Sequence, residues 1–356
     1  MNRTDKLRAS FDKLGIDAAV IYGELNQRYL CGFAFTDGLL LITREKAYLI
    51  TDFRYYEMAH LGAFKNYEVV IPDNKTEFIS GVFKSENCSA VGFEGGIVSF
   101  ADYTKLCSSH PSIRFVSIGN AIEEQRQIKD ESELKIMQKA QDITDKAFSE
   151  LLKKLKPDMT EIEVAAELEY QMRINGATGL AFDTIAVPGD ASSLPHGVPR
   201  REKLHRGFLT MDFGASLDGY CSDMTRTVCI GKADAEIKKL YDTVLSAQKA
   251  GLEILKAGVD CKEADKAARD IIDAIEEYKG TFGHSLGHGV GLFIHEDPRL
   301  AKSNGGRLLR VGEVVTVEPG IYLYGKYGCR IEDMVAIEEN GVYNFTHSPK
   351  NLIEIL

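Results

Sequence analysis

Short apolar runs alternate with longer mixed segments through the first third of the chain. Five of these runs have the length and composition of β-strands, at residues 18–22, 38–43, 47–51, 91–93 and 115–118. The polar residues 44–46 form a turn between the second run and the third, and the other connecting segments have helical character. This alternation predicts a small α/β unit.

The pattern changes to a helical period shortly after this unit. Asp130 and Glu133 have the spacing of a capping box, in which the first side chain accepts the amide of the second residue. The apolar positions that follow, 136, 140, 143, 147 and 151, form one stripe along a helix. We therefore expect two domains, at residues 1–122 and 123–356.

The second domain is predicted to contain an internal repeat. Thr160 with Glu163, and Asp260 with Glu263, again have capping-box spacing, so each pair is expected to open a helix. In each copy a glycine-rich segment with a histidine follows, and then a β-hairpin that has an acid on both strands. Two such ααββ halves, related by a pseudo-two-fold axis, would direct their acids into one central space. The repeat therefore predicts a single site built from both halves.

The first hairpin shows how two of these acids can converge. The dipeptide Asp218-Gly219 is typical of a two-residue hairpin turn. With that turn, Asp212 lies opposite Thr225 and diagonal to Asp223. Both carboxylates then project from the same face of the hairpin, within reach of a shared ion.

The second copy supplies Glu318 and Glu332 on its hairpin and His288 in the segment before it. Taken singly, each acid is most simply a solvated strand residue, and the histidine a buried core residue. Four acids on inward strand faces, however, would repel one another unless they were protonated or compensated by cations, and divalent metals are the usual compensation. Four carboxylates balance two divalent ions, and this oxygen-rich set with one nitrogen suits Mn, Co or Zn. We therefore expect two divalent metal ions, which would activate a water for attack on an amide carbonyl.

Several motifs of the chain resemble those of a known family. They are Met211-Asp-Phe-Gly214, Ser222-Asp-Met-Thr-Arg226, Gly287-His-Gly-Val-Gly291 with Ile294-His-Glu296, Val317-Glu-Pro-Gly-Ile321 and Arg330-Ile-Glu-Asp333. In these motifs the chain resembles the aminopeptidase P and prolidase family, the Xaa-Pro branch of the pita-bread metallopeptidases. Residues 26–33 and 51–55 resemble the creatinase-type domain of the same branch. The resemblance implies an α+β pita-bread catalytic domain with duplicated ααββ halves, preceded by a small α/β creatinase-like domain.

The resemblance also implies a role for each proposed metal ligand. Asp212 would hold one ion, and Asp223 and Glu332 would bridge both. His288 and Glu318 would complete the second ion, with Mn as the first expectation and Co or Zn as alternatives. Glu318 would also move the proton during the reaction.

A second group of residues is implied to act on the substrate. His196 and His295 would hydrogen-bond the substrate and the tetrahedral intermediate. His284 and Arg330 would support the site from its rim or from behind the ligands. In prolidases an arginine at the place of Arg299 is associated with the free carboxylate of a dipeptide, a group that suits a bidentate arginine.

The function implied by this resemblance is metal-dependent hydrolysis of the bond before proline, a tertiary amide that lacks an N–H and needs a specialised pocket. Arg299 favours an Xaa-Pro dipeptidase. An Xaa-Pro aminopeptidase that acts on longer peptides is the alternative within the same chemistry. A non-enzymatic pita-bread binding module is an alternative from another class. A creatinase-like amidinohydrolase is a further alternative, although such relatives do not need the five metal ligands.

Composition narrows the partners and the location. The 53 acidic residues outnumber the 43 basic ones, giving a formal charge of −10, so the chain lacks the basic footprint of a nucleic-acid-binding protein. The seven cysteines include no Cys-x-x-Cys pair, the N-terminal segment has no apolar signal region, and no apolar run is long enough to span a membrane. We expect a cytoplasmic protein with small peptide substrates that have proline at the second position, and no nucleic-acid or membrane partner. The family further implies a homodimer.

Overall fold

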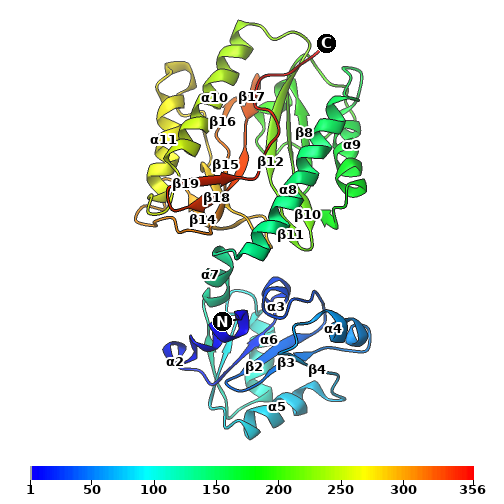
Figure 1. Cartoon of the computed structure of the whole chain (residues 1–356), viewed down its shortest axis with the longest axis vertical. Helices are drawn as coiled ribbons and strands as arrows, with labels where there is room; N and C mark the ends of the chain where they lie inside the picture. The colour runs from blue at the N-terminus through cyan, green and yellow to red at the C-terminus, as the bar shows by residue number, and fades with distance from the viewer. Residues whose placement is uncertain (1) are drawn as a thin grey trace. The chain divides into compact units, whose positions relative to one another are not determined.

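The computed structural model describes residues 2–356, which form two compact units divided after Arg126 (Figure 1). The helix α7 (Ala121–Gln127) ends at this division. The domain limit that the sequence suggests near residue 122 stays a prediction. Among the described residues, no helix is both long and apolar enough to cross a lipid bilayer.

The N-terminal unit is built on a six-stranded sheet with the order β4-β3-β2-β1-β5-β6. Its strands are β1 (Ala18–Ile21), β2 (Leu39–Thr43), β3 (Ala47–Ile50), β4 (Glu68–Val70), β5 (Ala90–Phe93) and β6 (Arg114–Ser117). β2 is antiparallel to both neighbours, and the other pairs are parallel. The five predicted strands are confirmed. The sequence did not reveal β4, because this edge strand is only three residues long and partly exposed, and its apolar pair Val69-Val70 was too short to predict a strand.

Helices accompany this sheet. They are α1 (Arg3–Arg8), α2 (Phe11–Leu14), α3 (Glu24–Cys31), α4 (Tyr56–Gly62), α5 (Lys75–Ser85) and α6 (Phe100–Ser109). Polar side chains cap α1, α5 and α6. Asn74 accepts the first amides of α5, and Ser99 accepts the amide of Asp102 in α6. Val82 and Phe83 of α5 pack with Leu41 of β2 in the core between helix and sheet.

The first half of the C-terminal unit consists of two helices and the strands that follow them. It contains α8 (Glu131–Leu152), α9 (Glu161–Ile174), β7 (Gly179–Leu180), β8 (Ile185–Pro188), a 3-10 turn (Gly189–Ser193), β9 (Gly207–Phe213), β10 (Ala215–Leu217), β11 (Tyr220–Cys221) and β12 (Met224–Ile230). The capping boxes predicted for Asp130 with Glu133 and for Thr160 with Glu163 are both present. The strands form the sheets β20-β12-β9-β8 and β11-β10-β7.

The second half repeats this order. It contains α10 (Ala235–Ile254), α11 (Cys261–Asp273), a 3-10 turn (Glu276–Tyr278), β13 (Gly287–Gly289), β14 (Glu296–Leu300), β15 (Val314–Val317), β16 (Gly320–Leu323), β17 (Tyr327–Arg330), β18 (Asp333–Glu338), β19 (Gly341–Asn344) and β20 (Glu354–Ile355). The strands form the sheet β14-β13-β15-β18-β19 and the hairpin β16-β17. Asp260 caps α11 through the amide of Lys262 and also accepts the amide of Gly306, so the reciprocal box predicted with Glu263 is wrong.

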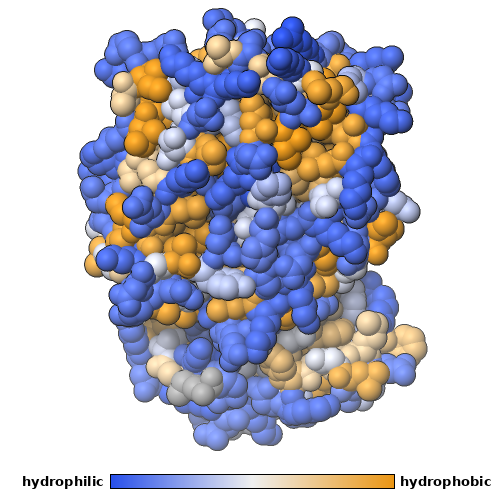
Figure 2. Space-filling view, turned by 45° about the horizontal axis from the view of Figure 1, so that its top comes forward, coloured by the Kyte–Doolittle hydropathy of each residue, from blue (hydrophilic) through white to orange (hydrophobic). Residues whose placement is uncertain are grey.

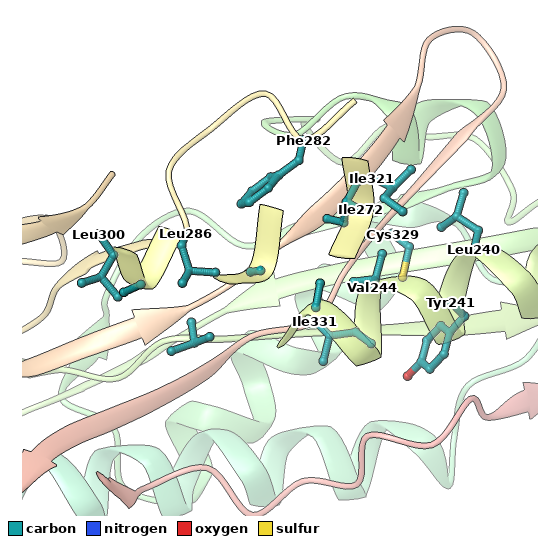
Figure 3. Packing of buried hydrophobic residues seen from close by; sticks show 14 of the residues in the cluster. Leu240, Tyr241, Val244, Ile272, Phe282, Leu286, Leu300, Ile321, Cys329 and Ile331 are labelled. Carbon is teal, nitrogen blue, oxygen red and sulfur yellow. The ribbon is translucent and has the colours of Figure 1, made fainter. Parts of the chain in front are cut away.

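The two helix pairs of the C-terminal unit lie on either side of its strands, α8 with α9 and α10 with α11 (Figure 1). Figure 3 shows Leu240 and Val244 of α10 and Ile272 of α11 gathered against Ile321 and Ile331. Each such buried aliphatic side chain contributes about 1.5–3 kcal/mol to folding. This core fixes the strands that carry the second pair of acids.

Candidate metal and substrate site

A cavity of about 280 Å³ in the C-terminal unit is lined by every residue that the sequence assigns to the site. These residues are His196, Asp212, Asp223, His284, His288, His295, Arg299, Glu318, Arg330 and Glu332. This volume of about 280 Å³ lies just below the range of about 300–1,000 Å³ that ligand pockets usually have. The cavity therefore suits a small ligand.

The first pair of acids is placed by the hairpin of β9 to β12. Asp212 pairs with Thr225, as the sequence predicts, and Asp223 directly precedes β12. The turn residues Asp218 and Gly219 both have positive φ, the conformation that a tight two-residue turn requires.

The position after Asp212 and Phe213 requires glycine. A Cβ atom at Gly214 would lie 2.0 Å from the carbonyl oxygen of Ser222. Only glycine allows the two arms of the hairpin to approach this closely. The close approach brings the segment before Asp223 next to the end of β9.

The second pair of acids is placed by β15 and β18. Val317 pairs with Asp333, so Glu318 and Glu332 lie immediately beyond that pair. His288 enters from β13, whose Gly289 pairs with Val315 of β15. A Cβ atom at Gly289 would lie 2.2 Å from the carbonyl oxygen of Asp297, so this strand also depends on glycine.

The floor of the cavity holds Asp223, His288 and Glu332. All three side chains are buried, and one ligand atom from each lies within 4.8 Å of the others. His288 Nδ1 is 3.0 Å from the carbonyl oxygen of Gly289, which can only accept, so Nδ1 carries the ring proton. The unprotonated Nε2 then faces Glu318 Oε1 at 3.3 Å and Asp223 Oδ2 at 3.5 Å.

The electrostatics of this floor favour bound cations. Burial lowers the pKa of His288 to about 3, so the imidazole is neutral at neutral pH and Nε2 offers a lone pair. Burial, with repulsion from neighbouring acids, raises the pKa values of Asp223 and Glu332 well above their ordinary range, and burial raises that of Glu318 to about 7. Without a cation, these carboxyl groups therefore tend to hold protons at neutral pH. Divalent cations among them would favour the ionised carboxylates, displace these protons and be coordinated in their place.

The hydrogen bonds of Asp212 also show whether the site fits a metal ion. Its Oδ2 accepts a hydrogen bond from Arg330 at 2.6 Å. Its Oδ1 is buried, lies at the cavity and has no hydrogen-bond partner within residues 2–356. A buried carboxylate oxygen without a partner is costly, and a metal ion would satisfy it. The donors present thus fit divalent cations.

Arg330 is buried and is held by protein groups. Besides Asp212 it donates to Tyr322 Oη at 2.7 Å and to Thr225 Oγ1 at 3.0 Å. Tyr322 Oη in turn lies 3.1 Å from His284 Nε2. These contacts suit a supporting role, and direct binding of the substrate by Arg330 or His284 stays a prediction.

The rim of the cavity is exposed and basic. His196, His295 and Arg299 lie there with exposed side chains. The His295 ring contacts the His288 ring edge to face, with centroids 4.5 Å apart. Glu296 accepts the amide of Phe293 and so fixes the turn that presents His295.

Sequence reasoning missed the apolar wall and one acid of the cavity. Phe182, Ile185 and Ile294 line it, and Asp183 lies beside them. Phe182 to Ile185 precedes β9 in a segment without a recognisable chemical motif, so no pattern pointed to these residues. Alignment of β8 with β9, which pairs Ile185 with Asp212, would have revealed them.

Comparison with known proteins identifies the family of the chain. Residues 135–339 match the model of metallopeptidase family M24, and residues 3–128 match the Creatinase/Prolidase N-terminal domain. The chain is similar to a curated Xaa-Pro dipeptidase from Pyrococcus horikoshii, with 38% identity over 99% of this chain and 98% of the relative.

Two solved structures extend the similarity to the whole fold. An Xaa-Pro dipeptidase from Bacillus anthracis is 40% identical, with a TM-score of 0.95 over 99% of both chains. An X-Pro aminopeptidase from Thermotoga maritima is 36% identical, with a TM-score of 0.91 over 100% of both chains. The family resemblance and the pita-bread fold predicted from the sequence are confirmed. The chain belongs to metallopeptidase family M24 and is an enzyme of that family, with a Creatinase/Prolidase N-terminal domain.

Proposed function

We propose that this protein is an Xaa-Pro dipeptidase that uses two divalent metal ions. The observation that carries the proposal is the division of one small cavity into a buried acidic floor and an exposed basic rim. The floor suits cations, and the rim suits the carboxylate of a short peptide. Relatives titled Xaa-Pro dipeptidase at 38% and 40% identity support the same substrate class.

Five residues would hold the metal ions. Asp223 and Glu332 would contact both ions, Asp212 would hold one of them, and His288 with Glu318 would hold the other. Divalent ions in such a site supply charge stabilisation and a nucleophile at neutral pH. The number of ions is inferred from the charge of four carboxylates, and Mn is proposed as the natural metal, with Co or Zn as alternatives.

The side chains of this chain would bind and orient the peptide. The Arg299 guanidinium would bind the terminal carboxylate of the dipeptide through two parallel hydrogen bonds. His196 and His295 would donate hydrogen bonds to the carbonyl oxygen of the scissile bond. Phe182 and Ile185 would contact the apolar parts of the substrate and exclude water.

Proton movement is assigned to Glu318. One of its oxygens lies 3.1 Å from Thr316 Oγ1, which fixes the orientation of the carboxylate. In this position Glu318 would accept the proton of the attacking water and pass it to the proline nitrogen as the bond breaks. Arg330 would hold Asp212 Oδ2, so that Oδ1 keeps facing the cavity.

Paired substrates test the proposal. The metal-free protein is reconstituted with Mn²⁺ and assayed on Ala-Pro and on Ala-Pro-Ala. A dipeptidase should cleave Ala-Pro with the higher kcat/KM and lose this activity when the metal is removed. Efficient cleavage of the tripeptide with neglect of Ala-Pro would overturn the dipeptidase assignment.

An Xaa-Pro aminopeptidase is the second candidate. The X-Pro aminopeptidase from Thermotoga maritima, which is similar over the whole chain, favours it. This function would appear in the same assay as preference for the tripeptide. Protein that stays inactive on both peptides after Mn²⁺ or Co²⁺ is added would favour a binding module instead.

A homodimer in the cytoplasm completes the proposal. Figure 2 shows hydrophobic patches among hydrophilic residues on one face of the molecule. In the N-terminal unit, Phe53, Met58 and Leu61 are 88%, 60% and 79% exposed on and next to α4. Such exposed apolar side chains are typical of an interface. Light scattering of the purified full chain would test the dimer.

A further inference from the structure

Arg226 is a fully buried arginine that lies next to the proposed metal site but does not line its cavity. Each of its five N–H donors has an acceptor. Nη1 donates to the carbonyl oxygens of Thr225 at 3.0 Å and Glu332 at 2.5 Å. Nη2 donates to Asp333 Oδ1 at 2.8 Å and to the carbonyl oxygen of Ser348 at 2.8 Å, and Nε donates to that of Pro349 at 3.1 Å.

These bonds join three segments that are far apart in the sequence. Thr225 and Arg226 belong to β12 in the first half, whereas Glu332 and Asp333 precede and begin β18 in the second half. β12 and β18 lie in different sheets, so no strand ladder connects them. The guanidinium also binds the C-terminal segment at Ser348 and Pro349. Arg226 is therefore a bridge between the halves at the point where each contributes an acid.

Asp333 completes the bridge and differs from its neighbour Glu332. Its side chain is fully buried, with Oδ1 on Arg226 and Oδ2 on Lys350 Nζ at 2.5 Å and Asn344 Nδ2 at 2.9 Å. Both oxygens are therefore used by protein donors. Asp333 cannot serve as a metal ligand in this arrangement, although it follows a proposed ligand directly.

A second set of bonds connects the same two segments. The Glu332 amide donates to the carbonyl oxygen of Thr225 at 3.1 Å, and Thr225 Oγ1 donates to Glu332 Oε2 at 2.7 Å. These short-range bonds orient the Glu332 carboxylate toward Asp223. Arg226 Nη1 binds the carbonyl oxygens of the same two residues, so the guanidinium and these bonds hold the same pair of backbones.

We propose that Arg226 and Asp333 are positioning residues that fix the spacing between Asp223 and Glu332 and thereby set the affinity of the site for metal. Lys350 and the C-terminal segment support them from outside. Because a buried ion pair seldom adds much stability over apolar packing, we assign this pair a role in the geometry of the site. The inference rests on the metal-ligand roles of Asp223 and Glu332 in the proposed function.

The test measures Co²⁺ binding to the metal-free full chain by calorimetry and by visible absorption. Asp333→Asn and Arg226→Lys keep the size of the side chain but weaken the bridge. Loss of outer partners of metal ligands costs about 10–100-fold in metal affinity. We expect the Kd for Co²⁺ to rise by that factor and kcat on Ala-Pro to fall, with KM for Ala-Pro nearly unchanged.

Glu313→Gln is the matched control. Glu313 is also a fully buried acid paired with two cations, Arg307 and Arg310, but it does not line the cavity. The control should lose stability as Asp333→Asn does and keep the wild-type Kd for Co²⁺ within about twofold. Wild-type Co²⁺ affinity in both Asp333→Asn and Arg226→Lys would refute the inference.

If Asp333→Asn or Arg226→Lys does not fold, the Kd for Co²⁺ of Lys350→Met tests the inference instead. Lys350 is 23% exposed and contacts Asp333 from the outside, so its loss should be tolerated. A rise of at least threefold in the Kd for Co²⁺ is expected, and an unchanged Kd with unfolded central variants would count against the positioning role.

Glu332→Gln separates this inference from the function on which it rests. If the wild type does not bind Co²⁺, or Glu332→Gln binds it as well as the wild type, the metal-site assignment itself is wrong. If Glu332→Gln loses Co²⁺ while the Arg226 and Asp333 variants keep it, only the positioning role is wrong.

Discussion

Some polar atoms in this cavity lie in surroundings that are unfavourable when no cation is bound. The lone pair of His288 Nε2 faces two carboxylates, and Asp212 Oδ1 is buried without a partner among the described residues. Each state costs free energy when no cation is near, because desolvated charges and lone pairs repel. The same arrangement favours a cation once one binds.

Glu318→Gln tests the proton-transfer role. The amide keeps the size of the side chain but cannot accept a proton, so kcat on Ala-Pro should fall by about 10²–10⁴-fold. The metal-free variant should melt no lower than the metal-free wild type, because one of several repelling acids has been removed. Steady-state kinetics and thermal melts measure both effects, and full activity of the variant would refute the assignment.

Arg299→Ala tests recognition of the substrate carboxylate. Loss of a charge-assisted bond should weaken Ala-Pro recognition by about 1.5–3 kcal/mol, seen as a higher KM. The effect on Ala-Pro-Ala should be smaller, because its carboxylate lies one residue further away. Arg201→Ala removes an exposed arginine that does not line the cavity, and it should leave both KM values unchanged.

At the scale of strands and turns, close backbone approach determines where the acids lie. Gly214 and Gly289 have no room for a Cβ atom, and each is next to or near a proposed ligand. The hairpin register and the turn at Asp218 place Asp212 and Asp223 on the two arms. These local features make the site a property of the hairpins.

Gly214→Ala tests this dependence. The new Cβ would lie 2.0 Å from the Ser222 carbonyl oxygen, so the hairpin must open, at a cost of about 1–3 kcal/mol. Gly341→Ala is the matched control, because no atom lies within 4 Å of its Cβ position. Denaturant unfolding should show loss of stability only for Gly214→Ala, and equal stability of the two variants would contradict the argument.

Asp17 provides a pH-dependent contact between β1 and β5. Amide donation by Ser89 at 2.9 Å and Ala90 at 3.0 Å holds the pKa of Asp17 below its usual value, although burial opposes the shift. A lowered folded-state pKa stabilises the fold at neutral pH, and this contribution is lost as the pH falls below about 4. Asp17→Asn should therefore destabilise the protein at pH 7 and much less at pH 3.

Urea unfolding at the two pH values measures this difference. Asp73→Asn is the control, since Asp73 is exposed in the same unit. An Asp17→Asn variant with the same loss of stability at both pH values would show that the carboxylate charge is not the cause.

Most elements could be predicted because their signals are local. The strand runs, the turn at Asp218 and the box at Thr160 depend on neighbouring residues, and the structure contains all three. The capping box predicted at Asp260 is absent. The amide of Gly306, which is distant in the sequence, donates a hydrogen bond to the Asp260 carboxylate, and no local pattern shows this contact. The wall at Phe182 and the bridge at Arg226 arise from tertiary packing, which leaves no periodic pattern in the sequence.

At the scale of the whole molecule, metal binding should be linked to folding. Cations that bind only the folded state stabilise it by RT ln(1 + [L]/Kd), or about 2.7 kcal/mol at 100 times Kd. Addition of Mn²⁺ to the metal-free protein should therefore raise its Tm in a concentration-dependent way. Asp223→Asn should reduce this shift, and an equal shift in that variant would exclude Asp223 as a ligand.

Because both halves of the C-terminal unit lie in one chain, formation of the complete metal site does not depend on protein concentration. One half contributes two carboxylates and the other half contributes two more, so a half alone could neutralise a single divalent charge. Two separate halves would need to meet in solution before they could enclose two cations. Covalent linkage makes that encounter intramolecular, so the complete constellation forms at any protein concentration.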